Sequence, residues 1–246
     1  MSLSASDLTI RRGDVPALTG VSTSLSGGSI TAICGPNGAG KSTLLMALAG
    51  LLEPSTGAAA LEGASLASLH PRVRARRIGY LPQEASVAWD VSVANLVRLG
   101  RMPHRDRGEE AVESAIAALD LQPLRHRPAS QLSGGEKART LLARVLAGEP
   151  EWILADEPLA ALDLGHQVTL LRHLRSAANE GAGVVLVLHD LAQAMNHADH
   201  VLVLKEGRLI ADGPPQDALS GEIIADVWGV TARWLGEPGA RALVTG

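Results

Sequence analysis

The chain has 246 residues, of which 46% are hydrophobic, and these values predict a folded soluble protein with one large domain or two small lobes. Its formal net charge of -4 indicates no polyanion partner, so we expect no nucleic-acid binding. No hydrophobic run has the roughly 18 to 20 residues that a spanning helix needs, and residues 1–12 lack a signal-peptide core, which predicts a cytoplasmic protein. The single Cys34 excludes an internal disulfide and predicts a buried side chain.

The predicted elements begin with a small antiparallel sheet. Segments 3–10 and 17–28 show short alternating hydrophobic patterns bounded by turn residues, which are typical of such sheets. Short hydrophobic runs then alternate with longer helical patterns, and this order predicts an α/β fold with a largely parallel central sheet. The runs are 29–34, 77–82, 152–156, 183–190 and 200–207, and segment 207–215 predicts a hairpin arm.

A helical lobe is predicted inside this α/β core. Between about residues 84 and 145 the strand pattern disappears, and helical periodicity appears in 91–101, 108–121 and 135–148. We therefore expect one composite domain over residues 1–246, with a core lobe formed by 1–83 and 146–246 and a helical subdomain formed by 84–145. No internal repeat or long linker interrupts the sequence.

A phosphate-binding loop follows the first predicted core strand. GPNGAGKS, residues 35–42, fits G-x-x-x-x-G-K-[ST] between a hydrophobic strand and a hydrophobic helix. Glycines let backbone N–H groups turn inward around phosphates, and the helix start adds partial positive charge. Lys41 is expected to reach the β- and γ-phosphates, and the Ser42 hydroxyl to bind Mg²⁺. The predicted nucleotide-binding residues of this loop are Gly35, Pro36, Asn37, Gly38, Ala39, Gly40, Lys41, Ser42 and Thr43.

Polar side chains follow three other predicted strands, at the edge where ligands bind in parallel sheets. We expect Asp156 to hold Mg²⁺ directly or through its water, and Glu157 to orient and deprotonate an attacking water. His189 is placed to hydrogen-bond a γ-phosphate oxygen, and Gln83 to offer its amide oxygen to Mg²⁺ or to the water. Taken alone, each has a structural alternative, and the phosphate loop favours the functional interpretation.

A second glycine-rich helix start, LSGGE, lies at residues 132–136 inside the predicted helical lobe. Ser133 just before a helix is typical of an N-cap that serves its own fold. The hydroxyl, the N–H groups and the dipole of such a helix start also suit a triphosphate. The residues alone do not say why one chain carries two phosphate-type loops.

Six motifs in order resemble those of the ATP-binding cassette ATPases, the nucleotide-binding subunits of ABC transporters. They are GPNGAGKST (Walker A), Gln83 (Q-loop), LSGGE (signature), ILADEP (Walker B), ALD ending at Asp163 (D-loop) and His189 (switch). The resemblance implies a P-loop NTPase fold, with a RecA-like core, an antiparallel β-subdomain and a helical subdomain. It also implies hydrolysis of ATP with Mg²⁺ by a head-to-tail dimer, in which Ser133, Gly134, Gly135 and Asp163 contribute to nucleotide sites shared with a second copy.

The resemblance implies further partners and a location. Integral membrane permease subunits, and indirectly a substrate-binding protein, would join the chain at the cytoplasmic face of the cell membrane. Residues 83 to about 107 are expected to contact the permease, and the run 89–105, WDVSVANLVRLGRMPHR, resembles importers of iron-siderophore, haem and vitamin B12 complexes. The alternatives are an importer of a metal ion or polar solute, an ABC ATPase acting on DNA or ribosomes, and a merely solvated face formed by the arginines at 98, 101, 105 and 107.

The chain departs from the family pattern at two places. An aromatic residue usually stacks on adenine near the end of the first strand, where this chain has Arg12 and no aromatic residue before Tyr80. The planar guanidinium could stack on the base, or Arg12 is a solvated arginine. Leu159 and Ala160 stand where relatives commonly carry Thr and Ser, which removes two hydroxyl groups next to the D-loop.

Overall fold

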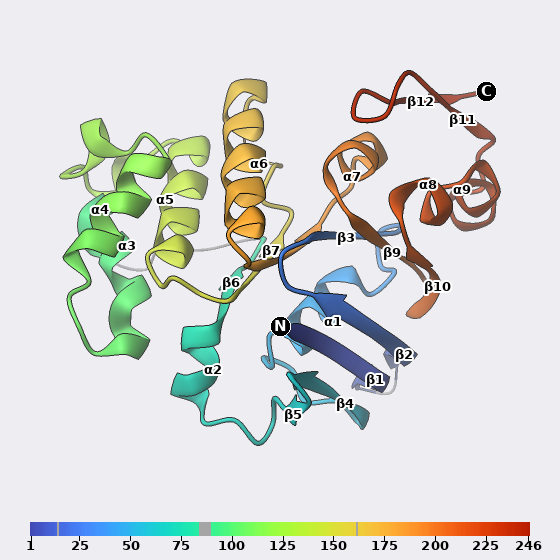
Figure 1. The fold of residues 1–246 in the computed structure, drawn as a ribbon, viewed down its shortest axis with the longest axis horizontal. Helices are drawn as coiled ribbons and strands as arrows, with labels where there is room; N and C mark the ends of the chain where they lie inside the picture. Colours follow the sequence, from blue (N-terminus) through green and yellow to red (C-terminus); the bar gives the residue numbers. More distant parts are fainter. Residues whose placement is uncertain (14, 84–89, 161) are drawn as a thin grey trace.

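The computed structural model describes residues 1–13, 15–83, 90–160 and 162–246 (Figure 1). Its central sheet has the strand order β10-β9-β3-β8-β7-β6, and neighbouring strands from β9 to β6 run parallel. The bounds are β3 (Ile30–Cys34), β6 (Ile78–Leu81), β7 (Trp152–Asp156), β8 (Gly183–Val187), β9 (His200–Lys205) and β10 (Arg208–Gly213). The five predicted core strands and the hairpin arm are confirmed.

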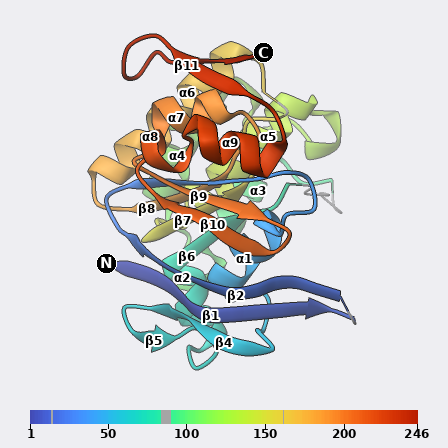
Figure 2. The ribbon, with the colours of Figure 1, turned by 90° about the vertical axis from the view of Figure 1, so that its right-hand side faces the viewer.

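Both faces of the central sheet are covered. Every residue of β3, β7 and β8 is buried, as expected for parallel strands between two layers. Within β7, Ile153 and Ala155 belong to the hydrophobic core beside α6 (Leu164–Asn179) and α7 (Leu191–His197), whereas Leu154 belongs to the core beside α1 (Lys41–Leu48). Figures 1 and 2 show these helices on opposite sides of the sheet.

The predicted antiparallel sheet is present and larger than expected. Its order is β2-β1-β4-β5, formed by β1 (Ser2–Arg12), β2 (Val15–Ser26), β4 (Thr56–Leu61) and β5 (Ala64–Ser65). The sequence did not predict β4, because its TGAAAL sequence has little intrinsic preference for strands. Pairing with β1, from Leu3 opposite Leu61 to Thr9 opposite Thr56, holds this segment in the sheet.

Helices group at one end of the central sheet, beyond β6 (Figure 1). They are α3 (Val93–Arg98), α4 (Glu109–Ala118) and α5 (Gly134–Leu146), with the 3-10 helices η1 (Leu99–His104), η2 (Gln122–Leu124) and η3 (Ala129–Gln131). The helix predicted over 91–101 is shorter than expected and changes to 3-10 geometry at Leu99, next to Gly100 and Pro103. Residues 84–89 of this region lie outside the described parts of the chain.

The remaining elements are α2 (Pro71–Arg77), α8 (Pro215–Ala218), α9 (Gly221–Trp228) and the hairpin of β11 (Ala232–Leu235) and β12 (Ala242–Thr245). This hairpin was not predicted. It contacts α7, where Asn196 accepts from the Arg241 backbone N–H at 2.8 Å. Among the described residues, no helix combines the length and hydrophobicity needed to cross a bilayer.

Candidate active site

The phosphate-binding loop lies between β3 and α1, as predicted. Gly35 has a φ of 150°, and a Cβ atom there would lie 2.2 Å from the Leu204 carbonyl oxygen, so only glycine fits. The loop ends at Gly40, which precedes α1 without any side-chain cap. The helix start therefore faces the loop with no side chain in the place of a ligand anion.

Lys41 is almost completely buried, at 6% exposure, and its side chain folds back over this loop. Its Nζ donates hydrogen bonds to the carbonyl oxygens of Gly35 at 2.8 Å and Pro36 at 2.9 Å. Burial lowers the pKa of the Lys41 ammonium, and the nearby Glu157 carboxylate opposes this shift. Cys34, the last residue of β3, is fully buried as predicted, and burial raises the pKa of its thiol to about 12.

Three of the predicted catalytic side chains meet at the carboxyl edge of the sheet. Because β6, β7 and β8 run parallel, Gln83, Glu157 and His189 follow their strands at the same edge. Gln83 Nε2 donates to Glu157 Oε2 at 2.8 Å, and His189 Nε2 lies 2.5 Å from Glu157 Oε1. Both oxygens of the Glu157 carboxylate are therefore held by residues from neighbouring strands, and its side chain is only 12% exposed.

Asp156 lies deeper than Glu157, at 4% exposure, and its Oδ1 has no hydrogen-bond partner. Burial raises the pKa of the Asp156 carboxyl, and a hydrogen bond with Ser42 acts in the opposite direction. An unpaired buried carboxylate oxygen beside a serine hydroxyl is a donor set that suits Mg²⁺. In the described parts of the chain, no three His, Cys, Asp or Glu side chains cluster as metal ligands.

One open pocket, with a volume of about 810 Å³, lies at the phosphate loop, and Asp156 is not among the residues that line it. The loop residues 37–43, Gln83, Glu157 and His189 form part of its wall, and the exposed Arg12 lines it too. Val15, Pro16 and Ala17 complete the lining, and the sequence analysis missed them. The signal that could have found them is their place opposite Arg12 in the β1-β2 hairpin, where Arg12 pairs with Val15.

The signature segment does not contribute to this pocket. Ser133 and Gly134 are exposed and Gly135 is half-buried, at the start of α5. Ser133 and Glu136 form a capping box, in which Glu136 N–H donates to Ser133 Oγ at 3.3 Å and Ser133 N–H to Glu136 Oε2 at 2.7 Å. Ser133 therefore caps α5, as the N-cap alternative predicts, while Gly134 stays exposed.

Asp163 is also absent from the pocket lining. It is exposed and caps α6, where its Oδ1 accepts from His166 N–H at 2.9 Å and lies 2.8 Å from His166 Nδ1. Within the preceding turn, Leu159 is buried and Ala160 is exposed, while Ala161 of the predicted D-loop lies outside the described residues.

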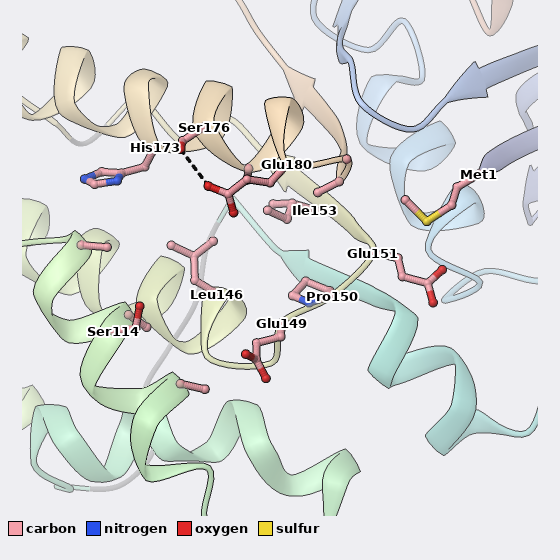
Figure 3. A pocket seen from close by; sticks show the side chains of 16 residues that line it. Met1, Ser114, Leu146, Glu149, Pro150, Glu151, Ile153, His173, Ser176 and Glu180 are labelled. Atoms are coloured by element: carbon pink, nitrogen blue, oxygen red, sulfur yellow. Dashed lines mark hydrogen bonds between the residues drawn. The ribbon is translucent and has the colours of Figure 1, made fainter.

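A second hollow, of about 590 Å³, lies between α4 and α6 (Figure 3). Its acidic side chains already have partners, since Glu149 pairs with Arg101, Glu151 with Arg77, and Glu180 accepts from Ser176. None of the predicted site residues lines it, so the pocket at the phosphate loop is the candidate active site.

The arginines of the expected permease surface do not form a uniform solvated face. Arg105 and Arg107 are exposed, but Arg101 is 7% exposed, so this alternative is wrong for Arg101. Its guanidinium pairs with Asp106 at 2.8 Å and Glu149 at 2.6 Å, and donates to the Ala147 carbonyl oxygen at 3.1 Å.

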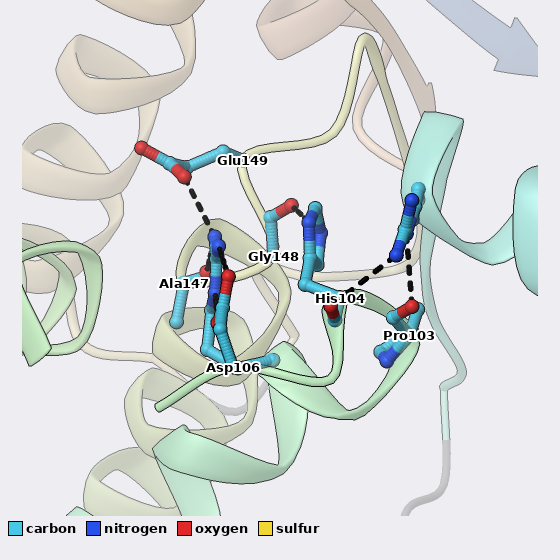
Figure 4. A network of polar contacts seen from close by, with 8 residues as sticks. Pro103, His104, Asp106, Ala147, Gly148 and Glu149 are labelled. Carbon is cyan, nitrogen blue, oxygen red and sulfur yellow. Dashed lines mark hydrogen bonds and ion pairs between the residues drawn. The ribbon is translucent and has the colours of Figure 1, made fainter. Parts of the chain in front are cut away.

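Further hydrogen bonds from His104 and Arg76 extend this cluster, which is shown in Figure 4. His104 Nε2 lies 3.0 Å from the Gly148 carbonyl oxygen, and Arg76 of α2 donates to the Pro103 carbonyl oxygen at 2.8 Å. Gly100 allows the close approach, because a Cβ atom there would lie 2.0 Å from the Arg144 carbonyl oxygen. We call residues 100–106 with 147–149 the Arg101 clasp; it fastens η1 to the segment that leads into β7.

Comparison with known families agrees with this site. The family described as "ABC transporter" matches residues 18–160, more than half of the chain. The chain belongs to this family, which confirms both the resemblance seen in the sequence and the P-loop NTPase fold class. It is therefore an ATP-binding and ATP-hydrolysing subunit of the ABC transporter class.

Individual relatives narrow the class. The chain is 43% identical over 234 residues to the hemin import ATP-binding protein HmuV of Rhodococcus jostii, covering 93% of this chain and 80% of that protein. It is 41% identical to the protein of the same name from Myxococcus xanthus, covering 100% of this chain and 98% of the relative.

Solved structures show the same architecture. An inward-facing ABC transporter, proposed to be of metal-chelate type, matches with a TM-score of 0.81 and 27% identity over 100% of this chain and 96% of that chain. A dimeric ATP-binding cassette in a post-hydrolysis state, bound to ADP and phosphate, matches with a TM-score of 0.79 and 26% identity over 87% and 98%.

Proposed function

We propose that this chain hydrolyses ATP with Mg²⁺ to power the import of haem or a related metal chelate through a membrane permease. One observation carries the catalytic part, namely the meeting of Gln83, Glu157 and His189 in the pocket of the phosphate loop. The cargo class rests on the hemin import relatives and on the metal-chelate type transporter of the same fold.

In the proposed mechanism, residues 35–43 bind the phosphates and the Lys41 ammonium offsets their charge. Glu157 orients a water in line with the γ-phosphorus and accepts its proton, because both carboxylate oxygens are aimed by Gln83 and His189. Ser42, Asp156 and the amide oxygen of Gln83 would hold Mg²⁺, which when bound stabilises charge on the phosphates.

In this mechanism the His189 side chain can bond either Glu157 or the bound nucleotide. Its Nε2 now contacts Glu157 Oε1, and the same atom would reach a γ-phosphate oxygen in the loop. A bound phosphate thus competes with Glu157 for His189. This competition frees one carboxylate oxygen for the attacking water when substrate is present.

A second copy of the chain completes each site in this proposal. Ser133, Gly134 and Gly135 lie at an accessible helix start, and Asp163 is exposed beside Leu164, whose side chain is 73% exposed. Their exposure supports a head-to-tail dimer in which these groups meet the nucleotide held by the other copy. The dimeric cassette of the same fold supports this arrangement.

We place the chain at the cytoplasmic face of the cell membrane, bound to permease subunits and indirectly to a substrate-binding protein. Large hydrophobic side chains are exposed on two adjoining elements near the predicted interface. Val73 of α2 is 45% exposed, and Leu99 and Met102 of η1 are 37% and 69% exposed. A hydrophobic patch held in place by the Arg101 clasp suits a permease helix.

The test combines one substitution with one purification. Glu157→Gln is expected to keep ATP binding, to lower hydrolysis by about a hundredfold or more, and to accumulate ATP-bound dimer in size-exclusion chromatography. Co-purification of a permease that imports haem in vesicles supports the cargo class. Unchanged hydrolysis removes Glu157 from its role, and capture of ribosomes or DNA instead of a permease contradicts transport.

A further inference from the structure

The turn between β7 and α6 is tied together by the side chain of Gln167. Gln167 Nε2 donates to the carbonyl oxygens of Leu159 and Leu162, each at 3.1 Å. The Leu159 oxygen also accepts from Leu162 N–H at 3.1 Å. One half-buried amide from the first turns of α6 thus fixes two carbonyl groups that lie five and eight residues before it.

His166, the preceding residue, holds the acidic side chain at the end of the same turn. Its backbone N–H and its Nδ1 both contact Asp163 Oδ1, at 2.9 Å and 2.8 Å. Two adjacent residues of α6 therefore act on different parts of the turn. Gln167 acts on its backbone and His166 on Asp163.

This turn begins at Glu157, which has a φ of 50° in the left-handed region that disfavours residues other than glycine. Such a conformation persists only where its surroundings hold it. A weak backbone bond from Ala160 N–H to the Glu157 carbonyl oxygen, at 3.3 Å, is the local support. Further along the turn, Gln167 supports the backbone through its bonds to the carbonyl oxygens of Leu159 and Leu162.

Between its two acidic ends, Glu157 and Asp163, the turn has no polar side chain. Pro158, Leu159, Ala160 and Leu162 are all nonpolar, and Leu159 and Leu162 are each 7% exposed. The side-chain hydrogen bonds to the backbone of this turn therefore come from Gln167 of α6.

We propose that Gln167 is a positioning residue for ATP hydrolysis. It positions Glu157 and Asp163 by fixing the turn that carries Glu157 at one end and Asp163 at the other. The inference rests on the proposed function, in which Glu157 serves the site of its own chain and Asp163 faces the second copy. Gln167 thereby sets the spacing between a catalytic carboxylate and the dimer face, while His166 orients Asp163.

The test uses Gln167→Met, which keeps the length of the side chain and removes both N–H donors. The kcat for ATP hydrolysis should fall about tenfold, the equivalent of about 1.4 kcal/mol, with KM for ATP within about twofold of wild type. Gln167→Lys, which keeps N–H donors, should recover a large part of kcat. The control is Gln216→Met, the same change at an exposed position of α8 outside the active-site pocket, which should keep the wild-type kcat.

Two results overturn the inference: a Gln167→Met kcat within twofold of wild type, or a loss that Gln167→Lys does not relieve in any part. Should Gln167→Met fail to fold, as judged by thermal unfolding, Gln167→Glu replaces it under the same criteria, because it keeps the size and loses the donors. Failure of the proposed function looks different. In that case the wild-type chain itself does not hydrolyse ATP, or Glu157→Gln hydrolyses it normally.

Discussion

The phosphate loop and the signature loop both place glycines at a helix start, yet the structure treats them differently. The start of α1 has no side-chain cap, and the buried Lys41 and Glu157, which follows β7, line one pocket with it. The start of α5 is capped by its own Ser133 and Glu136, lies exposed, and contributes nothing to that pocket. The first loop belongs to a nearly complete site, whereas the second is a capped and exposed helix start that lies outside this site.

This difference indicates that binding and hydrolysis can be separated by mutation. Changes at the phosphate loop should act on the site of the same chain. Changes at the signature loop should leave nucleotide binding in place and act only when two copies meet.

The largest effect is expected for Ser133→Arg. A long cation at the exposed helix start would block approach of a second copy, so hydrolysis should fall by about a hundredfold or more. ATP affinity, measured by isothermal titration calorimetry, should stay within about twofold, because Lys41 and its loop are untouched. Normal hydrolysis by this variant would contradict a site shared between two copies.

The next effect concerns the lobe that carries the signature loop. Arg101→Met should lower the free energy of unfolding by about 2 kcal/mol, less than for a fully buried ion pair because Asp106 and Glu149 are 49% and 66% exposed. Urea unfolding measures this change. Arg105→Met is the matched control at an exposed position and should change stability by less than about 0.5 kcal/mol.

Replacing the Asp156 carboxylate should stabilise the nucleotide-free protein, although Asp156 is a proposed Mg²⁺ ligand. Its folded pKa is raised by burial, so the charged carboxylate disfavours the folded state at pH values above that pKa, and the penalty disappears as the pH falls through it. Without nucleotide or Mg²⁺, Asp156→Asn should raise Tm at pH 7 by about 2 to 4 °C.

The same comparison at lower pH provides the check. The Tm difference between Asp156→Asn and wild type should shrink as the pH is lowered from 7, because Asp156 takes up its proton at a higher pH in the folded state than in the unfolded state. The comparison with Asn cancels the other carboxylates, such as Glu136, whose lowered pKa makes acid destabilising. A difference that grows as the pH is lowered would contradict a buried, disfavoured carboxylate.

The smallest effect is expected at Arg12. The exposed guanidinium lines the pocket and could stack on the base, so Arg12→Ala should weaken ATP binding by about two- to fivefold. Selectivity for ATP over GTP should be weak in wild type and nearly absent in the variant. A strong preference for ATP that survives the substitution would show that Arg12 does not stack on the base.

The fold and the main site could be predicted where the sequence signal is local. Strands such as β7 and β8 are hydrophobic at nearly every position because both faces are covered, and Glu157 and His189 lie within two residues of their ends. Lys41 was found through the glycine-rich motif that precedes it. Pattern and position are enough in these cases.

Features that depend on distant partners were missed. Arg101 sits in a run of arginines that is typical of a surface, and only its partners Asp106, Ala147 and Glu149 explain its burial. The role of Gln167 depends on carbonyl groups up to eight residues away, which no residue type reveals. The strand β4 is held by pairing with β1 in spite of its alanine-rich sequence.

The central claim is that each ATP site takes its phosphate loop from one copy and its signature loop from the other. The most direct measurement mixes two impaired variants, Lys41→Ala and Ser133→Ala, and follows ATP hydrolysis. Ser133→Ala removes the signature hydroxyl without adding a side chain that would block a second copy. A mixed dimer places both lesions in one site and leaves the other site intact, so activity should return to about a quarter of the wild-type rate. A mixture as inactive as either variant alone would contradict the shared site.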